Sequence, residues 1–136
     1  MMEEQFVSFD TAKLLKEAGF NVPCRGVYVT DRTGDYVFKE YEHKNTKDDL
    51  CWSSTDGFQY EYLAPTQALA ARWLREMHEL HVFAKRIYEY ALDKFSWGYY
   101  IQSSNYEYCK NFEIGFDEYE QAMEDGLREA IKLIKK

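Results

Sequence analysis

Two histidines stand at a spacing that can bring metal-binding side chains together. His78 and His81 form the pattern His-x-x-His, with Glu76 and Glu79 beside them. A zinc ion takes three or four protein ligands, and a hydrolytic site also keeps one position open for water. This pattern supplies at most two histidine ligands, and His81 is expected where a helix gives way to a strand. We therefore expect structural or exposed histidines and no cofactor, with His78 and His81 as the first residues to test for metal.

Cysteine chemistry is the second candidate. Cys24 follows Pro23 and precedes Arg25, a cation that would favour the thiolate. No histidine is paired with it in sequence, and it stands at the start of a predicted strand, so a buried inert thiol is favoured over a nucleophile. With Cys51 and Cys109 it makes an odd, widely spaced set of three. This spacing indicates reduced cytosolic thiols and neither a disulfide framework nor a zinc knuckle.

The remaining reactive patterns are weaker still. The acidic pairs Asp48-Asp49 and Glu124-Asp125 are expected in a loop and on a solvated helix face, where charges usually keep a protein soluble. The seven glycines are scattered and form no phosphate-binding loop. No residue is therefore predicted to be catalytic. An enzyme whose site assembles only in three dimensions stays as an alternative, with Cys24, His78 and His81 as the first residues to mutate.

Composition indicates one folded domain over residues 1–136, with 46% apolar and 30% charged residues. Aromatic residues reach 18%, with 12 Tyr and 9 Phe, and suit either a half-exposed sheet or a recognition face. The net charge of −7 repels phosphate backbones, which makes nucleic acid an unlikely partner. The acidic start of the chain argues against a secretory signal, and no apolar run is long enough to cross a membrane. We expect a cytoplasmic protein.

Three amphipathic helices are predicted. The first begins after the N-cap Ser8 and ends at Gly19, which can take the left-handed conformation of a helix terminus. The second begins near Thr66 and carries an apolar stripe as far as Leu80. The third begins at Asp117, with a capping-box pattern that is completed three residues later, and continues to residue 134.

Six strands are expected between these helices, over residues 26–30, 35–41, 58–63, 80–90, 95–102 and 106–114. Short hairpin-sized gaps favour antiparallel pairing. The fold class is therefore α+β: an antiparallel β-sheet with three helices packed on one face, in the order α-β-β-(β)-α-β-β-β-α. The polar stretch 42–57 is predicted to be a long exposed loop.

The order α-β-β-β-α from Thr66 onward matches the double-stranded-RNA-binding domain, whose basic helix and loops contact phosphate and 2′-hydroxyl groups. The basic residues here are few, and the third helix begins with Asp117, Glu118 and Glu120 where such a domain carries lysines. A weak nucleic-acid-binding function is therefore an alternative hypothesis, centred on the segment 65–94.

Several stretches resemble a group of small uncharacterised bacterial and phage-encoded proteins. They are Ser8–Gly19 with Phe20 and Pro23-Cys24, then Ala64–Gln67 leading to Trp73–Glu76 and His78, and finally Tyr119–Ala122 leading to Gly126-Leu127 and Ala130. The resemblance covers nearly the full chain and is weakest over 42–57. It implies a phage or prophage setting, and the group has no assigned activity or site residues to carry over.

The leading hypothesis is a non-catalytic interaction module that binds an unidentified protein partner or a second copy of itself. It rests on the high aromatic content together with the lack of a catalytic pattern. The candidate surface combines cations and tyrosines of the second helix and the hairpin that follows it. These residues are Arg72, Arg75, Lys85, Arg86, Tyr88, Tyr90 and Tyr100.

Overall fold

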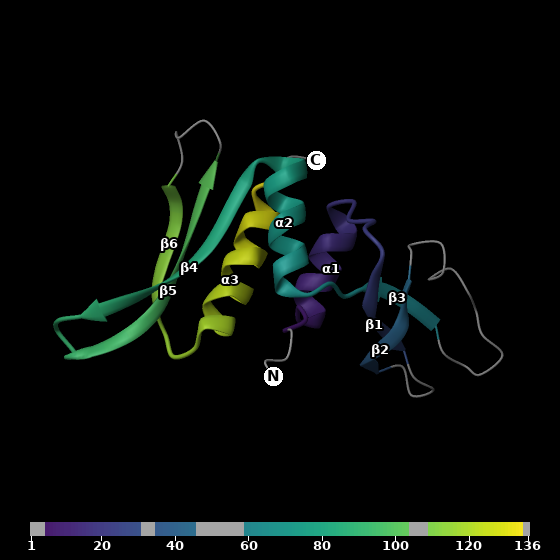
Figure 1. The fold of residues 1–136 in the computed structure, drawn as a ribbon, viewed down its shortest axis with the longest axis horizontal. Helices are drawn as coiled ribbons and strands as arrows, with labels where there is room; N and C mark the ends of the chain where they lie inside the picture. Colours follow the sequence, from purple (N-terminus) through teal and green to yellow (C-terminus); the bar gives the residue numbers. More distant parts are fainter. Residues whose placement is uncertain (1–4, 31–34, 46–58, 104–108, 135–136) are drawn as a thin grey trace. The chain divides into compact units, whose positions relative to one another are not determined.

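The computed structural model describes residues 5–30, 35–45, 59–103 and 109–134. The chain divides into two compact units, Met1–Thr66 and Gln67–Lys136, which we describe separately. Figure 1 labels their helices and strands. The single domain predicted over residues 1–136 stays a prediction.

The helix of the first unit, α1, spans Phe9–Glu17 and is fixed by its two ends. The Ser8 hydroxyl accepts a hydrogen bond from the backbone N–H of Thr11, as an N-cap should. At the other end Gly19 has φ +91°, and the N–H of Phe20 donates to the carbonyl of Leu15 at 2.9 Å. This is a Schellman ending, and it confirms the predicted bounds.

The sheet of the first unit contains β1 (Cys24–Thr30), β2 (Tyr36–Asn45) and β3 (Gln59–Leu63) in the order β2-β1-β3, all antiparallel. The predicted hairpin and third strand are confirmed. The start of the predicted loop is wrong, because residues 42–45 continue β2 and Asn45 pairs with Cys24. An edge strand tolerates exposed charged side chains, so low hydrophobicity did not end the strand. Residues 46–57 of that loop lie outside the described residues.

The second unit begins with α2 (Gln67–His78) and continues with β4 (Leu80–Glu89), β5 (Lys94–Ser103) and β6 (Cys109–Phe116). It ends with α3, Tyr119–Lys132. The strands are antiparallel in the order β4-β5-β6. The predicted hairpin over 80–102 is confirmed, and so is the α-β-β-β-α order of elements from Thr66 onward.

Helix α3 lies against one face of this sheet (Figure 1). Gly126 allows the close approach, since a Cβ atom there would stand 2.9 Å from Val82 Cγ1 and 3.0 Å from Tyr99 Cγ. The side chains of Tyr99, Ile101 and Leu127 are almost fully buried in this contact layer. Packing between α3 and β5 therefore forms the core of the second unit.

The start of α3 differs from the prediction by one residue. Glu118 is the N-cap and makes no side-chain capping bond, so the predicted capping box at Asp117 is wrong. Strand β6 extends to Phe116 through a bulge at Gly115, which has φ +103°. Because β6 continues to Phe116, the chain must turn before a helix can begin, and α3 therefore starts at Tyr119, after the N-cap Glu118.

The α+β class, the antiparallel pairing and the order of elements are confirmed. The grouping of the strands differs from the expectation, since the described strands form two sheets of three rather than one layer. Strands that follow one another closely tend to pair with one another. Helix α2 lies between β3 and β4 in the sequence, and each trio of strands pairs within its own unit.

Candidate functional site

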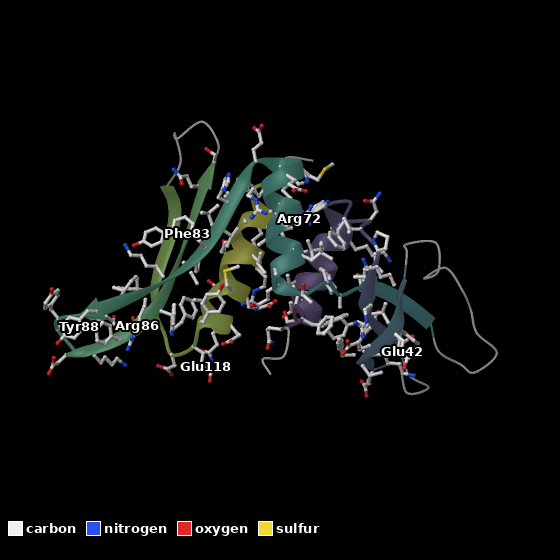
Figure 2. The ribbon with its side chains drawn as sticks, in the orientation of Figure 1. Glu42, Arg72, Phe83, Arg86, Tyr88 and Glu118 are labelled. Atoms are coloured by element: carbon white, nitrogen blue, oxygen red, sulfur yellow. The ribbon has the colours of Figure 1, made fainter. Side chains whose placement is uncertain are left out.

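The most exposed group of apolar side chains lies at the end of the β4–β5 hairpin. The two strands pair without a bulge from Leu80 with Ser103 to Glu89 with Lys94. Cross-strand pairing places Arg86 beside Trp97 and Tyr88 beside Phe95 on the face that carries α3. Figure 1 shows that the hairpin extends past the start of α3, and Figure 2 places Arg86 and Tyr88 on its outer part.

We call the side chains at this end the hairpin-end cluster: Arg86, Tyr88, Tyr90, Leu92 and Phe95. The ring of Tyr88 lies 5.0 Å from that of Phe95 and 4.8 Å from that of Tyr90, both edge to face. The guanidinium of Arg86 lies 4.1 Å from the centre of the Phe95 ring, in cation–π geometry. The exposed fractions are nevertheless 87% for Tyr90, 61% for Leu92 and 56% for Phe95.

The hydroxyl of Tyr88 donates a hydrogen bond to the Asp93 carboxylate in the hairpin turn. This hydrogen bond raises the pKa of Tyr88, because the phenolate could not donate it. Asp93 itself has φ +50°, a conformation that Asp tolerates better than most residues. The turn and the cluster are thus tied together, and the aromatic rings are held in place before any partner arrives.

The opposite face of the same sheet carries a smaller aromatic group. Phe83 stacks on Tyr100 with ring centres 5.3 Å apart and planes 18° apart. Pairing places Lys85 next to Gly98 on this face, and Ile114 of β6 pairs with Gly98 from the other side. Phe83 and Ile114 are 42% and 41% exposed. We call this group, Phe83, Lys85, Tyr100 and Ile114, the outer sheet patch.

The structure brings together part of the predicted interaction surface. Arg86, Tyr88 and Tyr90 belong to the hairpin-end cluster, while Lys85 and Tyr100 belong to the outer sheet patch. Arg72 and Arg75 are exposed on α2, where Arg72 forms an ion pair with Glu76 at 3.1 Å. Figure 2 shows Arg72 on that helix, away from the hairpin end of the same unit. The surface predicted as one group is therefore divided among three places.

Sequence reasoning missed Leu92, Phe95 and Phe83 as surface residues. Phe95 and Tyr99 lie on the same face of β5 at alternate positions, so the alternation does not show that Tyr99 is 2% exposed and Phe95 56%. The position of α3 explains the exposure of Phe95. Helix α3 begins at Tyr119, whose ring lies 5.3 Å from that of Trp97, and Phe95 lies two residues before Trp97 in β5, beyond the start of the helix. In the sequence, only the lengths of the predicted hairpin and of the predicted third helix could have indicated that the end of the hairpin is exposed.

The predicted chemical residues remain apart. Cys24 is 5% exposed, its thiol donates to the carbonyl of Gly26 at 3.7 Å, and burial raises its pKa to about 12. A thiol in this state is protonated at neutral pH and a poor nucleophile. Cys51 lies outside the described residues, and Cys109 is the first residue of β6.

The two histidines differ in environment. The ring of His78 stands edge to face against Trp73 at 4.7 Å, whereas His81 is exposed on β4. Within the described ranges no group of three His, Cys, Asp or Glu side chains could hold a metal ion.

The acidic pairs have ordinary surroundings where the structure describes them. Glu124 accepts a hydrogen bond from the side-chain amide of Gln67 at 3.0 Å, and Asp125 forms an ion pair with Arg128 at 3.2 Å. Both contacts lie within the second unit and join side chains of its helices. Asp48-Asp49 lies outside the described residues.

In the described part of the chain, none of the helices has the length and apolar character needed to cross a membrane. In comparisons with known proteins, no family model, no curated protein and no solved structure matches the chain. The resemblance to phage-encoded proteins therefore stays a prediction, and the functional argument depends on the geometry of the hairpin.

Proposed function

We propose that the chain is a non-catalytic module that binds another protein through its β4–β5 hairpin, in the cytoplasm and in a phage or prophage setting. The observation that supports the proposal is the hairpin-end cluster, in which Tyr90, Leu92 and Phe95 are each more than half exposed. Large exposed apolar groups that adjoin one another are typical of interaction sites.

The composition of the cluster suits recognition. Tyrosine and arginine are enriched among residues that dominate binding energy at protein interfaces, and aromatic side chains offer large contact area with few rotatable bonds. Contacts among Tyr88, Phe95 and Arg86 already restrict these side chains. Less side-chain entropy is therefore lost on binding than for isolated exposed residues.

Site-specific photo-crosslinking tests this proposal. A benzophenone side chain replaces Tyr90 in one version of the chain and Tyr36 in a control version, since Tyr36 is a 37% exposed aromatic residue of β2. We expect a discrete protein adduct from position 90 that is absent from position 36 and is lost when Phe95→Ala is added. If both positions give the same adducts, or neither gives any, the hairpin end is not an interaction site.

The confirmed α-β-β-β-α order favours a second candidate, the weak nucleic-acid-binding function. The charges do not favour nucleic-acid binding, because Arg72 is paired with Glu76 and the start of α3 carries the acidic residues Asp117, Glu118 and Glu120. A salt titration with duplex RNA and DNA separates the two candidates. We expect no retention even at low salt, and salt-dependent binding to either duplex would instead support the nucleic-acid function.

A further inference from the structure

Strand β4 forms one edge of its sheet, since in the described part of the chain it pairs with β5 alone. The packing beside it is also incomplete. Val82 and Ala84 of β4 are only half-buried, whereas their cross-strand partners Ile101 and Tyr99 are 1% and 2% exposed. An additional strand next to β4 would cover these side chains and satisfy the outward backbone N–H and C=O groups.

The other described edges offer a poorer template. Strand β3 has five residues, whereas β4 has ten in unbroken register. The pairing of β2 with β1 changes register between Cys24 and Gly26 of β1, and Glu40 of β2 forms an ion pair with Arg25 at 3.2 Å. The register of β6 shifts at two places against β5. Bulges of this kind twist an edge and interrupt its pairing, so β4 presents the longest regular edge.

The charges on β4 indicate which kind of segment would pair with this edge. Lys85 and Arg86 are consecutive residues at the middle of β4, one on each face of the sheet, and both are exposed, in a chain whose net charge is −7. Two copies of β4 that paired antiparallel about their middles would bring these cations close to those of the other copy, which is unfavourable. An extended segment with acidic side chains meets opposite charge there. Glu89, at the hairpin end of the strand, limits this preference to the middle of β4.

We propose that β4 accepts an extended acidic segment of a partner protein as a fourth strand. This inference rests on the proposed function and specifies the partner. Backbone hydrogen bonds supply affinity in such strand addition, and side chains at alternate positions supply specificity. Apolar side chains of the segment would pack beside Val82 and Ala84, and its carboxylates would face Lys85 and Arg86.

A peptide selection tests the proposal with the full chain. Random linear twelve-residue peptides are selected on the immobilised protein, and the affinity of the enriched peptides is measured by calorimetry. We expect enriched peptides in which two consecutive acidic residues lie next to apolar residues at alternate positions, because Lys85 lies on one face of the sheet and Val82, Ala84 and Arg86 on the other. Replacement of their Glu by Gln, or Lys85→Glu in the protein, weakens binding by about tenfold or more, whereas Lys44→Glu on the edge strand β2 leaves it unchanged.

Backbone pairing is tested on the peptide, so that the fold of the protein is not disturbed. In an antiparallel edge pair only every second amide of the peptide donates to β4. N-methylation at positions of one parity should weaken binding by about tenfold or more, and N-methylation at the other parity should change it far less. Equal tolerance of both methylation patterns overturns the proposal, as does a selection that yields no acidic peptides.

The outcomes also separate this inference from the proposed function. Peptides that are insensitive to methylation and to Lys85→Glu, yet no longer bind Tyr90→Ala, would place binding at the hairpin-end cluster and overturn strand addition alone. A dimer in light scattering that is cross-linked through β4 would identify a second copy as the occupant and overturn the acidic segment. No binding peptide, together with no crosslinked adduct at position 90, would overturn both proposals.

Discussion

The two sheets of the chain use aromatic side chains in opposite ways. In the first unit Phe9, the first residue of α1, stacks on Tyr36 with ring centres 4.3 Å apart and stands edge to face against Tyr28 and Tyr62 at 5.5 and 5.4 Å. In the second unit the ring of Tyr88 contacts the rings of Tyr90 and Phe95 beyond the start of the covering helix. The first group holds a helix on its sheet, and the second is presented to solvent.

The difference lies in where each helix begins relative to the strands. Helix α1 starts with a ring that packs on the sheet, whereas α3 starts at Tyr119 beside Trp97 and leaves the rest of the hairpin uncovered. High aromatic content therefore does not indicate a binding surface by itself. Only the rings that the helices leave exposed are candidates for recognition.

Glycine substitutions should show the largest contrast between the two units. In Gly26→Ala the new Cβ would stand 2.5 Å from the Ala64 carbonyl oxygen, a backbone atom that cannot rotate away. We expect the free energy of unfolding to fall by about 3 kcal/mol. In Gly126→Ala the neighbours are the side chains of Val82 and Tyr99, and alanine favours the helix, so the net loss should be about 1 kcal/mol.

Urea denaturation of both variants and of the unmodified chain measures this difference. Hydrogen exchange at the amides of β1 and of α3 provides the matched local readout, because each substitution lies in one of these elements. A larger loss for Gly126→Ala than for Gly26→Ala would show that α3 packs more tightly on its sheet than β1 packs beside Ala64.

Truncation of one ring in each unit should separate packing from presentation. We expect Phe9→Ala to lower the free energy of unfolding by about 2 kcal/mol, since a half-buried ring with three aromatic contacts is lost. Phe95→Ala removes a ring that is 56% exposed, and the cost should stay below about 1 kcal/mol. The measurement is the denaturation midpoint at constant m-value.

The same pair of variants sharpens the functional argument. Phe95→Ala should abolish the crosslink at position 90, and Phe9→Ala should retain it at temperatures where that variant is folded. A destabilisation by Phe95→Ala as large as that by Phe9→Ala would mean that the hairpin-end cluster is a structural core, and its role as an interaction surface would lose its support.

The features that sequence predicted well are those set by local physical chemistry. Ser8 and Gly19 determine the ends of α1 within one helix, and the hairpin of β4 and β5 follows from alternation over consecutive residues. The grouping of the strands into two sheets depends on which strand edges meet, and a sequence pattern does not encode that choice of partner. The exposure of Phe95 was missed for the same reason, since it depends on where α3 lies against a distant strand.

Cys24 offers the smallest effect at neutral pH, because its thiol is mainly protonated there in the folded and in the unfolded chain, and its raised pKa then does not change the stability. Burial holds the thiol protonated in the folded chain up to about pH 12, whereas in the unfolded chain its pKa is near the ordinary value of 9.0. The folded state therefore binds more protons above pH 9, and the stability contributed by Cys24 falls as the pH rises from about 9 towards 12. The free energy of unfolding of the unmodified chain, minus that of Cys24→Ala, should decrease over this range and stay constant between pH 6 and 8.

Alkylation at pH 8, mapped by mass spectrometry to separate Cys24 from Cys51 and Cys109, should be slower at Cys24 in the folded than in the unfolded chain by about a hundredfold or more. Rapid alkylation of folded Cys24 would mean that the first sheet opens readily beside Gly26, and the contrast between a closed first unit and an open hairpin in the second would fail.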